Sequence, residues 1–354
     1  MQPAKSSGPS PIHAPRLTWR KKALFSLVVL LLGLSVVEVA VRIRFGHPLP
    51  ERLPLVMVRA HRTRGWEMVP NTDHYTYEYR VAVNSLGLRG PELPPEKAPG
   101  ETRILVLGDS MVYGQGVADA GTVPVQLERA LDRPDVSVVN GGLRAYSTAQ
   151  ELALLRELGP KIQPDLVVLC WFWNDLDADP VEIQYGGLAG KGDVPLDTRA
   201  PLEGIKLFRW RLRQVVRKSA LVMLAHDLIM PDGDEWPTSE AQVAGFGKLD
   251  THLAELKRWS AAHNAPLVFV VIPNPNCLSE GHPSEKLEGE AAALARGHGI
   301  PVVETLPALR ALRDRAGSIL IPFDGHYVPA ANGVIAGEIA REACRHLSPI
   351  PPKR

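Results

Sequence analysis

The sequence predicts an α/β fold: a three-layer α/β/α sandwich with a doubly wound parallel sheet, preceded by one N-terminal transmembrane helix. Three observations support this prediction. Short, unbroken apolar runs alternate with longer amphipathic segments, which is the order of strands and helices in a parallel sheet. Turns rich in glycine, asparagine and aspartate follow several of these runs, at the ends where such sheets bind ligands. One apolar run near the amino terminus is just long enough to span a bilayer core.

The composition is that of a folded protein. The chain contains 354 residues, of which 45% are hydrophobic and 22% charged, enough for one large domain or two small ones. Its formal net charge of +1 gives no indication of nucleic-acid binding. The three cysteines, Cys170, Cys277 and Cys344, are an odd number without metal-like spacing, and we interpret them as packing residues. No metal or organic cofactor is expected.

Changes in composition divide the chain into five segments. They are a disordered basic tail (residues 1–22), a transmembrane anchor (23–41), a stalk with a lead-in strand (42–100), the main domain (101–347) with an insertion (176–247), and a short tail (348–354). The amino-terminal tail is rich in proline and serine and has no periodicity, which is typical of disordered segments.

The apolar run 23–41 predicts a single-pass membrane protein. Basic residues 20–22 favour a cytoplasmic amino terminus and an extracytoplasmic main domain, although Arg42 and Arg44 weaken this charge bias. A cleaved signal peptide is the alternative, but Glu38 would occupy the small-residue site that cleavage after Ala40 requires. We interpret Glu38 as an interfacial carboxylate, with a buried partner in a complex as the alternative.

The segment 42–100 is expected to join the anchor to the main domain. Three prolines among basic residues predict a stiff stalk over residues 44–64 that lies along lipid headgroups. Tyr75, Tyr77 and Tyr79 alternate with more polar positions, which predicts a half-exposed strand or hairpin arm. A linker rich in proline then leads to the first core strand.

Strands and helices alternate in the main domain. The expected strands cover residues 104–107, 136–139, 166–169, 267–272, 302–303 and 319–321, and the expected helices cover residues 123–131, 148–158, 249–263, 284–296 and 330–347. The strand runs are apolar without alternation, so helices should cover both faces of the sheet. The insertion 176–247 breaks this pattern with loops around a helical piece, residues 205–229, which would form a lid or a substrate wall.

The inserted helical piece is rich in arginine. Arg209, Arg211 and Arg213 are interleaved with apolar residues such as Phe208 and Leu212. One interpretation is a surface that contacts anionic lipid or an acidic glycan. The other, which we favour at this stage, is an amphipathic helix with a solvated basic face.

The most informative stretch is Gly108-Asp109-Ser110, directly after the first core strand. Glycine permits a sharp turn, so Ser110 would be exposed at the carboxyl end of that strand. Asp324 and His326 lie two positions apart near the other end of the chain. A serine becomes nucleophilic when an imidazole takes its proton and a carboxylate orients that imidazole. These three residues therefore predict a catalytic triad.

Two further strand ends supply hydrogen-bond donors. Gly142 follows the strand at 136–139, and Asn174 follows the strand at 166–169. A parallel sheet would bring both to the edge that carries Ser110, where the backbone N–H groups of Ser110 and Gly142 and the Asn174 amide would stabilise an oxyanion. Such donors contribute about 3 to 4 kcal/mol each. The alternative is that Gly142 and Asn174 simply close strand ends.

These blocks resemble the SGNH, or GDSL, hydrolases, a family named for its Ser, Gly, Asn and His blocks. The matching stretches are Gly108-Asp109-Ser110, Asn140-Gly141-Gly142, Trp173-Asn174-Asp175 and Asp324-Gly325-His326. The resemblance covers residues 75–347, and residues 83–90 are similar to the lead-in of a membrane-anchored branch. It implies a flavodoxin-like strand order, with Ser110 as nucleophile, Gly142 and Asn174 as oxyanion donors, His326 as base and Asp324 as its acid.

The chain departs from the family pattern at three places. Phe172 stands where the third block usually has glycine, and Ala145 replaces a glycine often found after the second block. Asp324 precedes His326 by two residues, whereas many relatives have a separation of three. None of these changes removes a reacting group.

The sequence thus predicts a membrane-anchored serine esterase that removes an O-acyl group, such as acetyl, from a carbohydrate or other envelope component through an acyl-serine intermediate. The same triad would make an O-acetyltransferase if a sugar hydroxyl replaced water as the acceptor. A non-catalytic tethered binding module is the alternative of a different class. The expected partners are an acylated carbohydrate or small ester and, through residues 23–41, the membrane; no protein partner is indicated.

Overall fold

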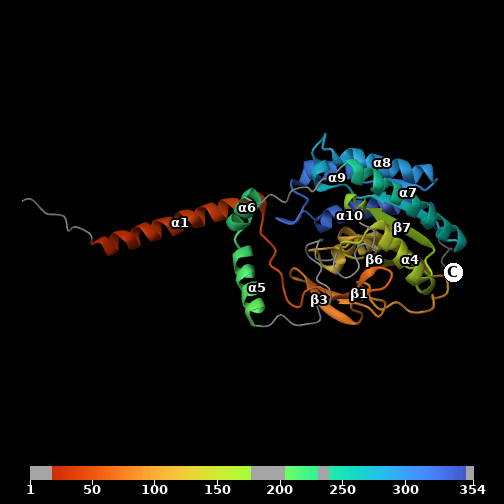
Figure 1. Cartoon of the computed structure of the whole chain (residues 1–354), viewed down its shortest axis with the longest axis horizontal. Helices are drawn as coiled ribbons and strands as arrows, with labels where there is room; N and C mark the ends of the chain where they lie inside the picture. The colour runs from red at the N-terminus through yellow and green to blue at the C-terminus, as the bar shows by residue number, and fades with distance from the viewer. Residues whose placement is uncertain (1–17, 177–203, 230–238, 348–354) are drawn as a thin grey trace, which may run out of the picture.

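The protein consists of a long amino-terminal helix and a globular α/β domain, here described from a computed structural model (Figure 1). The structure describes residues 18–176, 204–229 and 239–347. The tail predicted for residues 348–354, most of the tail predicted for residues 1–22, and two parts of the insertion, 177–203 and 230–238, lie outside the described residues.

A five-stranded sheet forms the centre of the domain, and every neighbouring pair of strands is parallel. Its strands are β5 (Thr102–Gly108), β6 (Val136–Gly142), β7 (Leu166–Trp171), β8 (Leu267–Val271) and β9 (Val302–Glu304). Their spatial order is β6-β5-β7-β8-β9, so the chain steps outward from β5 to β6 and then returns to β5's other side. This reversal is the switch point at which open α/β sheets bind ligands. The predicted doubly wound, flavodoxin-like order is confirmed.

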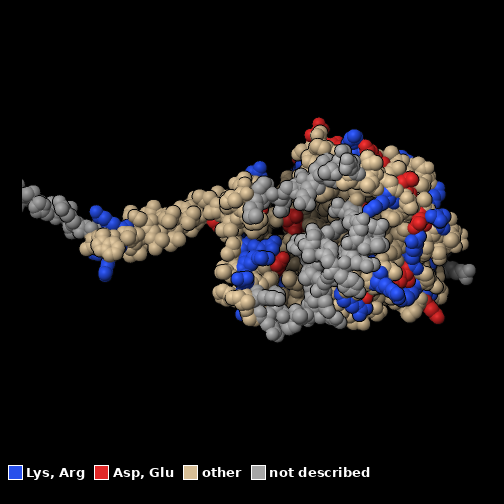
Figure 2. Space-filling view, in the orientation of Figure 1, with Lys and Arg blue, Asp and Glu red and all other residues tan. Residues whose placement is uncertain are grey.

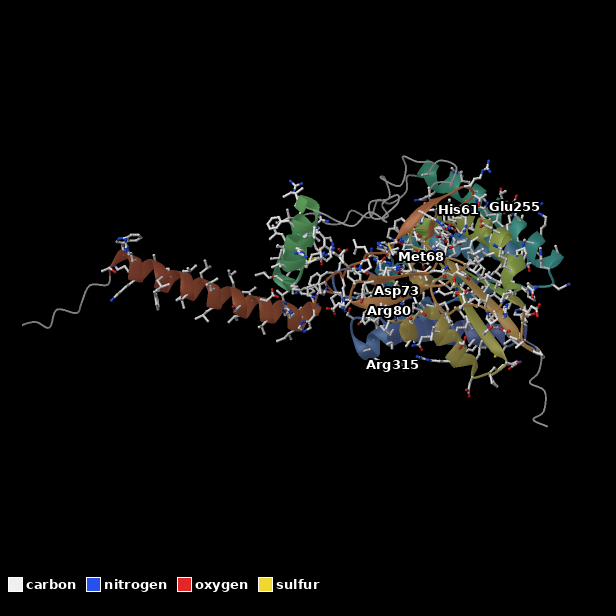
Figure 3. All side chains as sticks on the ribbon, turned by 90° about the horizontal axis from the view of Figure 1, so that it is seen from below. His61, Met68, Asp73, Arg80, Glu255 and Arg315 are labelled. Atoms are coloured by element: carbon white, nitrogen blue, oxygen red, sulfur yellow. The ribbon has the colours of Figure 1, made fainter. Side chains whose placement is uncertain are left out.

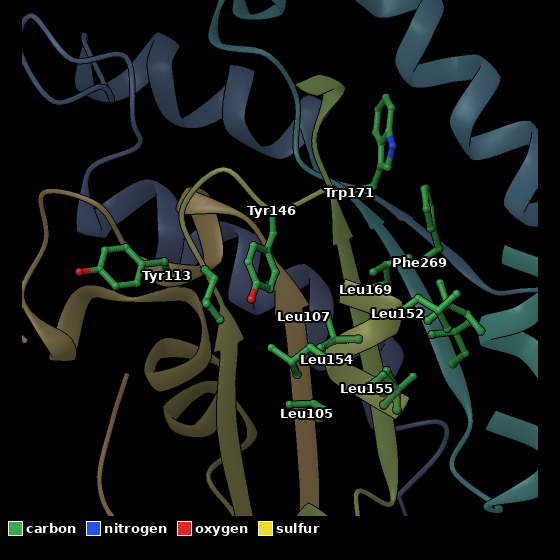
Figure 4. Packing of buried hydrophobic residues seen from close by; sticks show 14 of the residues in the cluster. Leu105, Leu107, Tyr113, Tyr146, Leu152, Leu154, Leu155, Leu169, Trp171 and Phe269 are labelled. Carbon is green, nitrogen blue, oxygen red and sulfur yellow. The ribbon is translucent and has the colours of Figure 1, made fainter. Parts of the chain in front are cut away.

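Helices cover both faces of the sheet because each strand is apolar on both. Leu105 and Leu107 of β5 belong to one buried cluster, whereas Ile104 and Val106 belong to the other, as alternation along a strand requires. The first cluster, shown in Figure 4, packs α4 (Thr148–Ile162), α7 (Ser239–Ala262) and α8 (Ser284–Gly297). The second packs α3 (Val123–Leu131), α9 (Leu306–Ala316) and α10 (Pro329–Ala343). Together the layers make the predicted three-layer sandwich.

The predicted strand at residues 319–321 is wrong, and α9 was not predicted. Leu320 forms only an isolated bridge with Tyr327, and the Ile321 N–H donates to the carbonyl of His326 at 2.7 Å. These apolar residues therefore pair with the other limb of their own loop rather than with the sheet. The apolar residues of the sequence indicate burial, but burial is the same for a strand of the sheet and for a packed loop.

The segment predicted as a stalk belongs largely to the domain. Two antiparallel hairpins, β1 (Val58–His61) with β2 (Gly65–Met68) and β3 (Thr72–Thr76) with β4 (Tyr79–Val83), precede the sheet. The second is the hairpin arm that the tyrosine alternation predicts. Trp66 is fully buried in the first cluster, where its ring meets Tyr146 edge-on with centroids 5.4 Å apart.

Charged residues conceal this packing in the sequence. Arg64 is buried, and its guanidinium donates to Glu67 at 2.7 Å and to Glu157 of α4 at 3.2 Å. A buried charge is tolerated only when it is paired in this way. Glu157 is distant from Arg64 in sequence, so this ion pair cannot be recognised from the local composition. The basic residues of the segment therefore predicted a solvated stalk, whereas part of the segment is buried in the core.

Helix α1 (Trp19–Phe45) extends away from the domain and includes the predicted anchor. Figure 3 shows its side chains projecting into open space, and Figure 2 shows a mostly uncharged surface between basic residues at its amino end and the domain. The helix is long and apolar enough to cross a membrane.

The helical piece expected at residues 205–229 is two helices, α5 (Gly204–Arg217) and α6 (Ala220–Ile229). The break falls at Lys218 and Ser219, beside the carboxyl-terminal part of α1. The break is stabilised by Glu38 of α1, which accepts from the N–H groups of Ala220 and Leu221 at the start of α6.

Replacing Trp66 by alanine should destabilise the domain by about 3 to 5 kcal/mol, because a large core side chain would leave a cavity. Thermal or chemical unfolding of the full chain in detergent measures this change. Val243→Ala, at an exposed position of α7, is the control and should change stability by less than about 0.5 kcal/mol. Equal small effects of both substitutions would show that the β1–β2 hairpin is not part of the cooperative core.

Candidate active site

Ser110 is the first residue of the short helix α2 (Ser110–Tyr113), immediately after β5. Asp109 caps this helix, since its Oδ1 accepts from the Met111 N–H at 2.8 Å. Gly108 lies in a tight space: a Cβ there would lie 2.3 Å from the Val112 side chain and 3.1 Å from the carbonyl oxygen of Cys170. The turn therefore holds Ser110 at the carboxyl edge of the sheet, as predicted.

The structure brings Ser110, His326 and Asp324 together. His326 Nε2 lies 2.8 Å from Ser110 Oγ, and His326 Nδ1 lies 2.5 Å from Asp324 Oδ1. With the Nδ1 hydrogen donated to the carboxylate, Nε2 can accept the serine proton. His326 is 17% exposed and Asp324 is 7% exposed, so the pair is shielded while the imidazole keeps some access to solvent.

A tight loop makes the two-residue spacing of Asp324 and His326 workable. Phe323 and Gly325 both have positive φ, 60° and 85°, and they turn the chain on either side of Asp324. The Asp324 N–H donates to the carbonyl of Ile321 at 3.2 Å, and the His326 N–H donates to Asp324 Oδ1 at 3.2 Å. The departure from the usual separation of three therefore leaves the acid and the imidazole in contact.

Tyr77 is a site residue that sequence reasoning missed. It lies in the turn between β3 and β4, and its hydroxyl donates to Asp324 Oδ2, which also accepts from Gln115 Nε2 at 3.3 Å. Burial opposes ionisation of Asp324, but the charge and hydrogen bonds of His326 and the Tyr77 hydrogen bond outweigh it and hold its pKa well below the ordinary value. Burial and the neighbouring Asp324 raise the pKa of Tyr77, which therefore stays a donor.

The structure does not support the predicted role of Gly142 as an oxyanion donor. Its N–H donates to Asn140 Oδ1 at 2.9 Å. A Cβ on Gly142 would lie 2.2 Å from the backbone nitrogen of Tyr113 and 2.6 Å from the carbonyl carbon of Val112. This glycine is needed because the end of β6 packs directly against the backbone of α2.

Ala145, three residues further on, has the backbone conformation expected of the missing family glycine. Its φ is 58°, in the left-handed region, and the residue is half-buried. Among the described residues no acceptor pairs with its N–H. The sequence shows only that alanine stands where related chains often have glycine, whereas the backbone angles show that this position is left-handed.

Asn174 lies beside Ser110, as predicted. It belongs to the short 3₁₀ turn η2 (Trp173–Leu176), and its Nδ2 donates to Asp109 Oδ2 at 3.2 Å. The same oxygen is 3.4 Å from Ser110 Oγ. Phe172 does not have a positive φ, and its N–H donates to Asp175 Oδ2 at 3.1 Å, so the backbone does not require the glycine usual at that position.

The chain is similar to several solved structures, among them a member of the G-D-S-L family of lipolytic proteins, an esterase and a lipase/acylhydrolase. A member from Veillonella parvula is 12% identical, with 69% of this chain aligned to 99% of that one at a TM-score of 0.41. The esterase EstA from Pseudoalteromonas is 14% identical over 69% and 98% of the two chains, with a TM-score of 0.40. The lipase/acylhydrolase from Enterococcus faecalis is 16% identical over 71% and 99%, with a TM-score of 0.39.

No protein-family model matches the chain, and no curated protein matches it in sequence. In the part of the chain that the structure describes, no group of three or more His, Cys, Asp or Glu side chains is arranged to hold a metal ion.

Asp109 in the Gly108-Asp109-Ser110 turn and Glu151 on α4 are two buried carboxyl groups that interact. Asp109 accepts hydrogen bonds from Met111 and Asn174, whereas neither oxygen of Glu151 on α4 has a partner among the described residues. Burial raises the pKa of both, and their mutual repulsion raises the pKa of Glu151 further. Burial without a hydrogen-bond partner therefore favours the protonated form of Glu151, which avoids a second buried charge close to Asp109.

This proton makes stability depend on pH. Unfolded, Glu151 loses its proton near pH 4.3, but folded it keeps the proton to much higher pH. Above the lower value the unfolded state binds fewer protons, so stability falls as pH rises toward the folded pKa. Glu151→Gln should reduce this loss as pH rises above the ordinary glutamate pKa of about 4.3, which thermal unfolding at a series of pH values measures. The exposed Glu290→Gln is the control, and an unchanged pH dependence in Glu151→Gln would show that Glu151 is ionised.

Proposed function

We propose that the protein is a membrane-anchored serine ester hydrolase of the SGNH type. The observation that carries this proposal is the chain of contacts from Ser110 Oγ through His326 to Asp324, with donor and acceptor atoms 2.8 and 2.5 Å apart. Serine, imidazole and carboxylate in this order form an activated nucleophile. The substrate is an O-acyl group, such as acetyl, on a carbohydrate or another envelope component, as the resemblance to the anchored branch implies.

The reaction proceeds by acylation and deacylation. Ser110 Oγ attacks the ester carbonyl while His326 Nε2 takes its proton and then passes it to the leaving alcohol. Water attacks the acyl-serine in the second step, with His326 again acting as base. Asp324 stays ionised and orients the imidazole, because its pKa is held well below the ordinary value.

The donors for the oxyanion are the N–H groups of Ser110 and Ala145 and the Asn174 amide. The Ser110 N–H lies in the first turn of α2, where no intrahelical acceptor exists. Asn174 Nδ2 carries two hydrogens and uses one on Asp109. Ala145 replaces Gly142 as the proposed second backbone donor, because the Gly142 N–H already donates to Asn140 Oδ1.

The anchor is α1, and the domain lies outside the cytoplasm. The length and apolar composition of α1 support the anchoring, and the basic residues 20–22 at its amino end support the orientation.

Full-length protein in detergent tests the proposal with a fluorophosphonate probe and p-nitrophenyl acetate. Wild type should be labelled and should hydrolyse the ester, and Ser110→Ala should lose both, because the probe and the ester require the same activated hydroxyl. Ser279→Ala, at an exposed serine, is the matched control and should behave as wild type. An unlabelled but folded wild type would favour the non-catalytic tethered binding module.

Tyr77→Phe should lower kcat about tenfold with little change in KM, because a hydrogen bond to a charged group contributes about 1.5 to 3 kcal/mol. The substitution removes only the donor that helps to orient Asp324. Tyr75→Phe, on the same hairpin, is the control. A loss of thermal stability without the kcat effect would show that the Tyr77 hydroxyl has only a structural role.

A further inference from the structure

The outward side of α5 carries an apolar stripe. Its members are exposed to solvent in the described chain; they are Ile205, Phe208, Leu212, Val215 and Val216. At about 100° per residue these positions fall on one side of the helix. Phe208 is 62% exposed, and together these neighbouring side chains form a contiguous apolar patch, which usually marks a contact site for a protein or a membrane.

The opposite side of α5 is fixed to the rest of the chain. Gln214 is buried, its Oε1 accepts from the Glu51 N–H at 2.8 Å, and its Nε2 donates to Glu51 Oε2 at 2.9 Å. Arg217 donates to Glu51 Oε1 at 3.2 Å. These bonds hold the helix so that the apolar stripe faces away from the domain.

Basic residues flank the stripe on both edges. Arg209 and Arg213 lie on one edge and Arg211 on the other, and all three are exposed. Figure 2 shows a basic patch where the helical region meets the domain. Long basic side chains beside an apolar stripe are typical of helices that lie in the headgroup region of an anionic membrane.

Helix α6 joins this surface to α1. Glu38 of α1 accepts from Ser219 Oγ at 2.8 Å and from the N–H groups of Ala220 and Leu221 at 2.9 and 2.8 Å, so it caps α6. Glu38, which the sequence predicts to be an interfacial carboxylate, therefore caps a helix, and it also accepts from Arg42 Nε of α1 at 2.6 Å. Figure 1 shows α5 and α6 at the domain end of α1, with α5 running across the direction of α1. A helix placed across a membrane span lies along the membrane plane.

We propose that the outward face of α5, with its flanking arginines, docks on the anionic surface of the bilayer that α1 spans. This rests on the proposed anchoring by α1. Two features favour a bilayer as the binding partner of this surface. The arginines complement anionic headgroups, and the hydrogen bonds of Glu38 hold α6, which is next to α5, against the apolar helix α1.

Docking would also fix the height of the active site above the membrane. The ring of Phe45, the last residue of α1, lies 6.5 Å from that of Phe323, the neighbour of Asp324. A Cβ on Gly46 would lie 2.5 Å from Cγ of Pro322 in the same loop. The loop that carries Asp324 and His326 thus lies directly at the end of α1.

Bimane fluorescence in proteoliposomes of phosphatidylcholine and phosphatidylglycerol tests the proposal. Full-length protein with Cys344→Ser carries one new cysteine, Phe208→Cys or Leu212→Cys, because Cys170 and Cys277 are buried. Lys286→Cys on α8, whose side chain is 82% exposed, is the aqueous control, and Leu31→Cys within α1 is the membrane control. Quenching by doxyl-labelled lipid and by iodide reports the surroundings of each label.

Labels at 208 and 212 should be quenched by doxyl lipid and protected from iodide, like the label at 31 and unlike the label at 286. This lipid quenching should fall in neutral phosphatidylcholine vesicles, and equally in the variant with Arg209, Arg211 and Arg213 changed to Gln, while quenching at 31 stays unchanged. Each exposed cation contributes roughly fivefold to partitioning on an anionic surface.

Three results would overturn the proposal. Iodide quenching at 208 and 212 equal to that at 286, with 31 still in lipid, would leave the anchor intact and show that α5 is in water. Protection of 208 and 212 from both quenchers would show that protein, such as a second copy, covers the stripe. Iodide quenching at 31 would refute the anchor itself, and the docking with it.

Discussion

The pairing of β5 with strands on both sides is the constraint on which the site depends. β5 pairs in parallel with β6 and with β7, and all three end at one edge of the sheet. Ser110 follows β5, Gly142 ends β6 and Asn174 follows β7, so the register of the sheet sets their separations. Slipping one strand by a residue would reverse its buried faces and displace its polar end. The apolar cores on both faces therefore stabilise the geometry of the active edge.

Electrostatics at this edge is arranged in two layers. Above, a hydrogen-bonded series runs from Tyr77 through Asp324 and His326 to Ser110, and it keeps one ionised carboxylate against the imidazole. Below, Asp109 caps α2, and burial raises the pKa of Glu151 and so favours its neutral form. Separating an ionised acid from a neutral one by environment is a common way to give similar groups different roles.

The candidate active site lies close to the carboxyl end of α1. Phe45 contacts the loop of Asp324, while Glu51, held by α5, is followed by Arg52, whose N–H donates to the carbonyl of Tyr77 at 3.1 Å. The helical region at the end of α1 and the acid of the triad are thus connected through one short stretch of chain.

The sequence by itself determined the sheet, the serine turn, the pairing of Asp324 with His326 and the apolar span, because these depend on local patterns of burial and turn formation. Only the tertiary structure decided the contacts that no motif in the sequence indicates. It moved Gly142 from oxyanion donor to packing position, gave Ala145 its left-handed backbone, joined Tyr77 to Asp324 and gave Glu38 a helix to cap. It also turned residues 319–321 into a loop limb and much of the stalk into core. These features depend on contacts between residues far apart in the chain, and no local pattern encodes them.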